Sequence, residues 1–112
     1  MTSHVTTHVL DATTGVPAAG VGVTLSRVEG ETATVLASGV TDDDGRNRQL
    51  GPERLEPGVY RMSFATGEYF AARGVATFYP SVNIDFLVEE GRAHYHVPCL
   101  LSPFAYSTYR GS

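Results

Sequence analysis

The residue types best suited to acid–base chemistry are four histidines, which fall into two pairs, His4 with His8 and His94 with His96. Residues two or four apart on a β-strand share one face, so each pair would present its imidazoles on the same side. An imidazole titrates near neutral pH and can accept or return a proton during a reaction. The pair His94 and His96, with His8 as a third ligand, could instead bind zinc. Any of the four could also be a surface or a hydrogen-bonded core imidazole.

A permanently charged donor, Arg46, follows the acidic turn Asp42-Asp43-Asp44-Gly45. A guanidinium is a planar fork of donors that suits flat anions, although an arginine beside such a turn can equally be solvated. The aspartates lack the spacing of an EF-hand loop, and one turn supplies too few oxygens for calcium. The pattern therefore favours a solvated turn.

The C-terminal segment is dense in aromatic residues and closes with Tyr109, Arg110, Gly111 and Ser112. Terminal residues usually fray and are simple and polar, so this composition predicts that the segment packs into something. Tyrosine offers a rigid ring with one polar tip, and arginine offers a charged fork. Together they suit recognition of a flat, polar, anionic molecule.

Other catalytic motifs are absent from the sequence. There is no Gly-x-Ser-x-Gly nucleophile elbow, no phosphate-binding loop and no dinucleotide fingerprint. Cys99 is the only cysteine, so no intrachain disulfide can form. It follows Pro98 in an apolar stretch, which indicates an inert, packed thiol.

Composition limits the partners of the chain, whose 112 residues fit one domain over 1–112. The net charge is −4 and no basic stripe exists, which argues against a nucleic-acid partner. No apolar run approaches the roughly 20 residues of a membrane span, and no signal peptide is evident, so the cytoplasm is the default expectation. Charged residues make up only 18% of the chain, which is compatible with surface hidden in an oligomer.

The elements that must position these residues read as strands. Valine and threonine are frequent, and glycine or proline punctuates the sequence at short intervals, as in an all-β sandwich or barrel. Val21, Val23 and Leu25 alternate with polar or small residues, which is the period of a half-buried strand. One short helix is expected over 67–74, centred on Glu68 to Arg73. Strands are expected over 4–10, 21–28, 34–41, 59–64, 83–88, 92–97 and 105–110.

Three segments resemble the 5-hydroxyisourate hydrolases, the transthyretin-related enzyme family of urate breakdown. They are Thr7–Asp11, Thr41–Arg46 and a C-terminal block that runs from His94–Pro98 to Tyr109–Ser112. The match covers the whole chain in order. The closing tetrapeptide is its specific part, because it separates this enzyme family from transthyretin, a hormone-carrying relative.

The resemblance implies an all-β fold: a transthyretin-like, two-sheet Greek-key β-sandwich with one short helix. It implies a homotetramer whose active sites lie in a channel where dimers meet, with no metal and no organic cofactor. It also implies that His8, Arg46 and His96 are catalytic. Substrate would be bound by His8 and Arg46 together with Tyr109, Arg110, Gly111 and Ser112. Whether Arg110 contacts the substrate or only anchors the C-terminal segment is left open by the sequence.

The implied reaction is hydrolysis of 5-hydroxyisourate to 2-oxo-4-hydroxy-4-carboxy-5-ureidoimidazoline in purine catabolism, by attack of water on a cyclic amide. His8 or His96 would act as general base, and the sequence leaves open which. Arg46 would hold the carbonyl side of the ring as negative charge develops. The alternatives are a transthyretin-like carrier of a small aromatic ligand, without turnover, and a structural or adhesion module.

Overall fold

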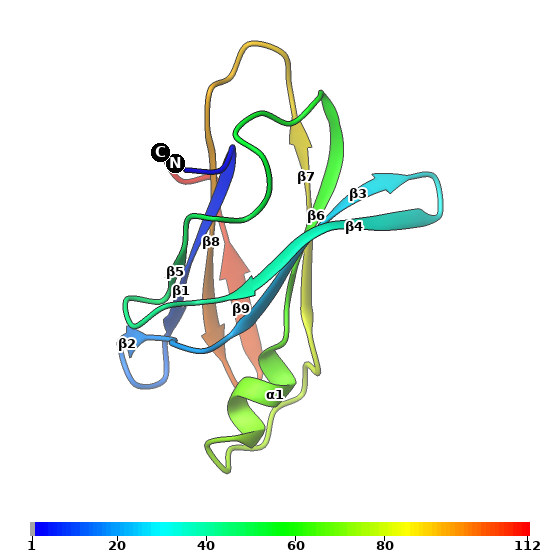
Figure 1. The fold of residues 1–112 in the computed structure, drawn as a ribbon. Coiled ribbons are helices and arrows are strands. Elements are labelled where there is room, and N and C mark those ends of the chain that lie inside the picture. Colours follow the sequence, from blue (N-terminus) through cyan, green and yellow to red (C-terminus); the bar gives the residue numbers. More distant parts are fainter. Residues whose placement is uncertain (1) are drawn as a thin grey trace.

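A computed structural model describes residues 2–112 and contains two β-sheets packed face to face (Figure 1). Helix α1 (Thr66–Ala71) lies at one end of the sandwich, between β6 and β7 in the chain. The five-stranded sheet runs β2-β1-β8-β9, with β5 also paired to β1, and the four-stranded sheet runs β4-β3-β6-β7. The strands are β1 (Val5–Asp11), β2 (Val16–Pro17), β3 (Gly22–Glu29), β4 (Thr32–Val40), β5 (Arg46–Asn47), β6 (Gly58–Phe64), β7 (Val82–Val88), β8 (Tyr95–Ser102) and β9 (Ala105–Thr108).

The core forms where the inner faces of the two sheets meet. Every second residue of β1 and β3 points inward, so Val5 and Val9 from one sheet and Val23 and Leu25 from the other are almost fully buried. The alternation read from the sequence is thus confirmed, and with it the two-sheet β-sandwich. Within residues 2–112, no helix is long and apolar enough to cross a membrane.

The single cysteine belongs to this core. Cys99 lies on the inner face of β8 and is fully buried. Burial raises the pKa of its thiol to about 12, so the reactive thiolate is scarce at neutral pH. The expectation of a packed thiol is confirmed.

Helix α1 lies one residue earlier than expected and is shorter, covering Thr66–Ala71 rather than 67–74. Its two aromatic residues, Tyr69 and Phe70, are buried against the sandwich. The last expected residues form hydrogen-bonded turns instead, and they close with Gly74 at a φ of 68°. A left-handed glycine at this position ends a helix without steric cost.

The strand expected over 92–97 is wrong in its position, because β8 covers Tyr95–Ser102 and continues through Pro98. The strand expected over 105–110 likewise ends early, at Thr108. The register of β9 on β8 would set Tyr109 opposite Pro98, and proline has no backbone N–H to donate. The ladder is interrupted there, and the chain meets β8 again only at Gly111.

Two short strands missed by sequence reading, β2 and β5, attach to β1 on the side away from β8. Strand β5 is reached through Gly45, which has a φ of 75° and whose carbonyl oxygen accepts a 2.7 Å hydrogen bond from the Val9 N–H. A Cβ at Gly45 would collide with the carbonyl oxygen of Val9. Only glycine satisfies both the backbone conformation and this close approach.

We therefore expect Gly45→Ala to destabilise the fold by about 1 to 3 kcal/mol, since it adds backbone strain and a backbone clash. Gly20→Ala is the matched control, because Gly20 has a φ of 77° and open space around its Cβ position. Thermal unfolding of both variants separates strain from collision. Equal losses of melting temperature would show that the contact with Val9 is unimportant.

Candidate active site

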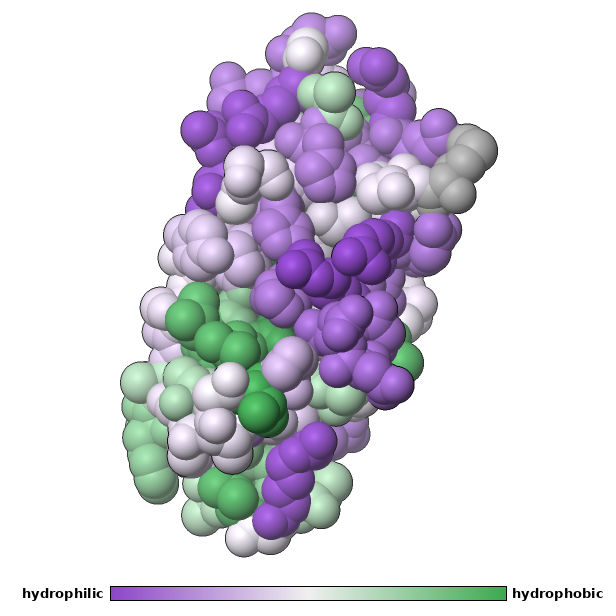
Figure 2. Space-filling view, turned by 90° about the vertical axis from the view of Figure 1, so that its left-hand side faces the viewer, coloured by the Kyte–Doolittle hydropathy of each residue, from purple (hydrophilic) through white to green (hydrophobic). Residues whose placement is uncertain are grey.

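A polar cavity of about 420 Å³ opens beside β1, β5 and β8. The side chains of β1 and β8 that do not enter the core include Thr6, His8 and His96, so the cavity lies on the outer face of the five-stranded sheet. Figure 2 shows this side of the molecule, where hydrophilic residues cover the middle and hydrophobic residues gather below them. The lining residues are Thr6, Thr7, His8, Arg46, Arg48, His94, His96, Tyr109, Gly111 and Ser112.

Strand pairing brings the distant parts of the sequence together. Strands β1 and β8 are parallel, with Thr6 opposite His96. Strand β5 is antiparallel to β1, with Arg46 opposite His8. Two adjacent ladders therefore place one imidazole from each end of the chain and one guanidinium from its middle beside the same cavity.

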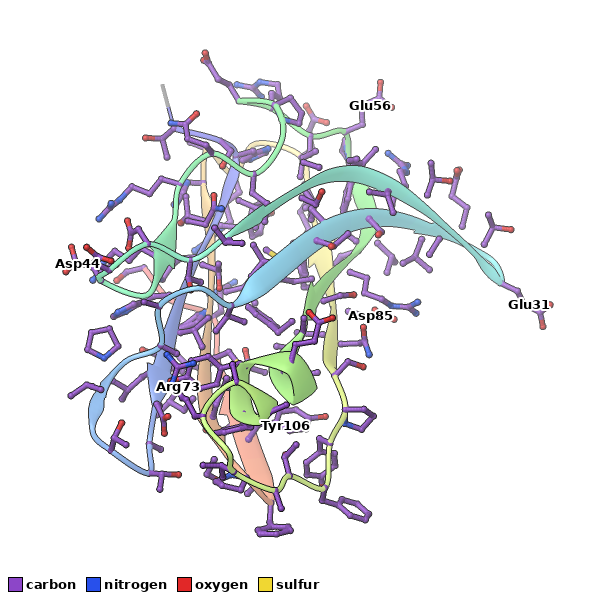
Figure 3. The ribbon with its side chains drawn as sticks, turned by 60° about the horizontal axis from the view of Figure 1, so that its bottom comes forward. Glu31, Asp44, Glu56, Arg73, Asp85 and Tyr106 are labelled. Carbon is purple, nitrogen blue, oxygen red and sulfur yellow. The ribbon has the colours of Figure 1, made fainter. Side chains whose placement is uncertain are left out.

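The acidic turn before β5 is organised by one of its three carboxylates. Asp42 Oδ1 accepts hydrogen bonds of 2.9 Å from the backbone N–H groups of Asp44 and Arg46. The bond from the Arg46 backbone is the main reason that the pKa of Asp42 lies below its usual value. Asp44 projects away from the sandwich (Figure 3). The turn thus fixes the start of β5, and with it the position of Arg46.

The surroundings of His96 favour the neutral form of its imidazole. Burial is the largest influence and lowers the pKa of this imidazole, and the positive charge of Arg46 lowers it further, as do His8 and His94. A hydrogen bond with the backbone of Thr6 partly offsets these effects. A neutral imidazole at physiological pH retains a lone pair, so His96 is able to accept a proton.

The C-terminal segment reaches the cavity through a close contact with β8. Gly111 donates a 2.9 Å hydrogen bond from its N–H to the carbonyl oxygen of His96. A Cβ at Gly111 would lie 2.5 Å from His96 Cδ2, so only glycine fits against this ring. Tyr109 and Ser112, on either side, also line the cavity although both are exposed.

Arg110 points elsewhere and lines a separate cavity of about 260 Å³. Its neighbours there include the apolar side chains of Ile84, Phe86 and Leu87. Of the residues expected from sequence to bind substrate, Arg110 is the one that the structure does not bring into the polar cavity.

The other expected residues gather as a group in one place, but His4 does not join them. His4 Nδ1 accepts a 2.7 Å hydrogen bond from the N–H of Leu55, and its Nε2 lies 2.8 Å from the carbonyl oxygen of Arg92. Both ring nitrogens are therefore occupied by the backbone, and His4 is the hydrogen-bonded core imidazole that the sequence left as an alternative.

Sequence reading missed three residues that line the cavity, Thr6, Thr7 and Arg48. Arg48 could have been found from its spacing. It follows Arg46 by two residues, and residues two apart in an extended segment point to the same side. The threonines carry no such signal. Their hydroxyls acquire a role only when β1 pairs with β8.

The electrostatics of the cavity favour an anion. Two guanidinium side chains, Arg46 and Arg48, line it, and none of its lining residues is Asp or Glu. This local positive charge contrasts with the net charge of −4 on the whole chain. Within residues 2–112, no three His, Cys, Asp or Glu side chains are grouped so that they could hold a metal ion.

The fold and the cavity define a class of protein, the transthyretin-like β-sandwiches. Residues 5–111 match the family model described as "Transthyretin: HIUase/Transthyretin family". The chain therefore belongs to the HIUase/Transthyretin family, which confirms the resemblance seen in the sequence.

Relatives within this family include both 5-hydroxyisourate hydrolases and transthyretins. A 5-hydroxyisourate hydrolase of Caulobacter vibrioides is 50% identical, over 98% of this chain and 99% of its own. The structure of the Klebsiella pneumoniae 5-hydroxyisourate hydrolase has a TM-score of 0.87 at 41% identity, covering 98% of this chain and 100% of that chain. Transthyretin from Sparus aurata has a TM-score of 0.90 at 34% identity, covering 96% of both chains. The fold alone therefore does not separate an enzyme from a carrier.

Asp42→Ala is expected to reduce any activity that depends on Arg46, because the turn loses the acceptor that fixes the start of β5. Asp42→Asn keeps a side-chain oxygen at the same place and serves as the matched control. The measurement is turnover together with the melting temperature of each variant. Full activity in the alanine variant would show that β5 pairing alone positions Arg46.

Proposed function

We propose that this protein hydrolyses 5-hydroxyisourate to 2-oxo-4-hydroxy-4-carboxy-5-ureidoimidazoline, as a single hydrolase domain over residues 1–112 in purine catabolism. One observation carries the proposal: two imidazoles, His8 and His96, and the guanidinium of Arg46 line one cavity that has no Asp or Glu in its lining. Relatives with 41–50% identity over most of this chain bear the name of this enzyme. The cytoplasmic location expected from the sequence stays a prediction.

The substrate class follows from the cavity. A flat, oxygen-rich ring with negative charge matches donors that are planar and positive, and Arg46 and Arg48 supply two such forks. Tyr109 and Ser112 add polar groups at the rim. A volume of about 420 Å³ lies within the usual range for small-molecule sites.

The reaction needs an activated water, a stabilised oxyanion and a proton for the leaving nitrogen. Water adds to the carbonyl carbon as an imidazole takes its proton, the C–N bond breaks, and the nitrogen leaves with a proton returned by an imidazole. Arg46 stabilises the negative charge on the former carbonyl oxygen, where a charge-assisted hydrogen bond strengthens as that charge grows.

Of the two histidines, we assign the general base to His96 and the orientation of water to His8. The lowered pKa of His96 favours the unprotonated imidazole that a base requires. No covalent nucleophile is needed, because water attacks an activated amide directly. Cys99 is sealed in the core and takes no part.

A transthyretin-like carrier is the alternative, since the fold matches both kinds of protein. Transthyretin from sea bream has been solved in complex with thyroxine, with a TM-score of 0.90 and 34% identity to this chain. The residues that favour an enzyme are His8, Arg46 and His96, because binding alone does not require proton-transfer groups. Absorbance of freshly made 5-hydroxyisourate, with and without protein, distinguishes turnover from binding.

We further propose that the protein is a homotetramer. Strands β7 and β9 end their sheets with unpaired edges, and several large apolar side chains are exposed, among them Phe78 at 70% and Phe104 at 68%. The cavity lies on an open sheet face where another copy could cover Tyr109, which is 60% exposed. Closed symmetry is the usual arrangement for such copies.

Single substitutions test the roles of the cavity residues. His96→Ala is expected to reduce kcat by about 10²- to 10⁴-fold through loss of proton transfer. His8→Ala is expected to reduce kcat by about 10²-fold through loss of the oriented water. Arg46→Ala is expected to cost about 3 to 4 kcal/mol of transition-state stabilisation. The control is His4→Gln, a histidine outside the cavity, and light scattering checks assembly in every variant. Near-normal turnover of the Arg46 variant would show that Arg46 does not stabilise the transition state and is only a residue of the turn.

Deletion of Tyr109 to Ser112 is expected to reduce turnover by about 10²-fold, because a ring, a hydroxyl and the Gly111 contact with His96 leave the cavity. The melting temperature is expected to change little, since Tyr109 and Ser112 are exposed and no core side chain is removed. Hydrolysis and thermal unfolding are measured on both forms. An active truncated protein would contradict the role of the segment, and gross unfolding would make it a structural clasp.

A further inference from the structure

We propose that Thr6 and His94 are positioning residues that set the protonation of His96 through a hydrogen-bonded chain, His94–Thr6–His96, at the wall of the cavity. The inference rests on the proposed function and deepens it. It explains how one imidazole can serve first as a base and then as an acid. Neither Thr6 nor His94 contacts the reacting atoms in this scheme.

Both distances in the hydrogen-bonded chain are short. Thr6 Oγ1 lies 3.0 Å from His94 Nε2 and 2.8 Å from His96 Nδ1, both within hydrogen-bond distance. Thr6 is 5% exposed, and within residues 2–112 its hydroxyl contacts no other hydrogen-bond partner. Among the residues that the structure describes, the two ring nitrogens are thus the only groups that hydrogen-bond to this buried hydroxyl.

A single proton on the hydroxyl couples the two rings. Threonine has one O–H to donate and lone pairs to accept with. If Thr6 donates to one ring nitrogen, the other ring must donate to Thr6 for both contacts to be hydrogen bonds. The tautomers of His94 and His96 are therefore linked, and two arrangements of opposite direction are possible.

The arrangement that suits a base is the one in which His96 Nδ1–H donates to Thr6 and Thr6 donates to His94 Nε2. His96 Nε2 then carries the lone pair. Within the described residues no protein hydrogen bond engages His96 Nε2, and the ring lines the cavity. The hydrogen-bonded chain therefore fixes the tautomer in which His96 Nε2 can accept a proton from water.

Transfer along the hydrogen-bonded chain holds the positive charge on His94 between the two proton transfers of the reaction. Water gives a proton to His96 Nε2, His96 Nδ1–H passes its proton to Thr6 Oγ1, and Thr6 passes its own proton to His94 Nε2. His94 is now the imidazolium, and His96 is neutral with its proton on Nε2. As that proton goes to the leaving nitrogen, the shift reverses with it: His94 returns its proton to Thr6 and Thr6 returns one to His96 Nδ1, so that no imidazolate forms and the first state is restored. No proton is created or lost, and no redox step occurs.

The surroundings favour moving the charge off His96. Burial and the guanidinium of Arg46 both disfavour an imidazolium at this position. Passing the charge to His94 relieves that cost during the reaction. The titratable and charged groups that share the two cavities with His96 are His8, Arg46, Arg48, Glu89, His94, Tyr95, Tyr109 and Arg110.

The first test reads the tautomers directly by ¹⁵N NMR of the histidine rings in the whole protein at neutral pH. We expect His96 to carry its proton on Nδ1 and to be unprotonated on Nε2. We expect His94 to be unprotonated on Nε2. In Thr6→Val, which removes the hydroxyl at nearly constant volume, the His96 proton should move to Nε2. A bare Nδ1 on His96 in the unmodified protein would overturn the proposal without any variant having to fold.

The second test is kinetic. We expect Thr6→Val to reduce kcat by about 10²-fold with little change in KM, because the wrong tautomer blocks proton transfer rather than binding. Thr6→Ser restores the hydroxyl and should recover most of that loss. Thr24→Val, at a half-buried threonine of the other sheet, is the matched control. The acidic limb of the kcat/KM profile should shift in Thr6→Val and not in Thr24→Val.

The outcomes separate this inference from the function on which it rests. If the unmodified protein does not hydrolyse 5-hydroxyisourate, the proposed function fails, and the NMR result alone decides whether the chain sets the His96 tautomer. If hydrolysis occurs and Thr6→Val has the kcat and the His96 tautomer of the unmodified protein, the proposed role of the hydrogen-bonded chain is wrong. The proposed hydrolase function is then unaffected. An equal loss in Thr6→Ser and Thr6→Val would make Thr6 a packing residue only.

Discussion

The parallel pairing of β1 with β8 is the interaction on which both the sandwich and the cavity depend. On its inner face the pairing buries Val5 and Val9 beside Val97 and Cys99, which form part of the core. On its outer face the same ladder sets Thr6 against His96. Because side chains alternate across a strand, one register fixes both faces at once, and a slip by one residue would exchange core for cavity.

Two glycines allow the other parts of the site to attach beside the paired strands β1 and β8. Gly45 lets β5 approach β1 closely enough to pair, and Gly111 lets the C-terminal segment lie against the ring of His96. Each position is one that a Cβ would fill, so both attachments depend on the absence of a side chain. The result is a cationic cavity, with Arg46 and Arg48, on a chain of net negative charge. Charge of this kind attracts an anion locally.

Much of the fold could be predicted from the sequence, since alternation and turn residues mark the long strands and the helix. The errors fall where tertiary contacts overrule local signals. Strand β8 runs through Pro98 because its pairing with β1 continues past the proline, while the ladder with β9 is broken at the same point. The two-residue strands β2 and β5 have no periodicity of their own, so their existence depends entirely on β1.

By itself the sequence determined the residue types and the order of the segments, and these identified the family and selected His8, Arg46, His96 and most of the last four residues. It could not decide which histidines meet. His4 and His8 are equivalent in spacing, yet backbone groups occupy both nitrogens of His4. Arg110 turns to another cavity, and Thr6 gains its importance only beside His94 and His96. The register between distant strands decides which side chains become neighbours across a sheet. That register cannot be predicted from the local sequence.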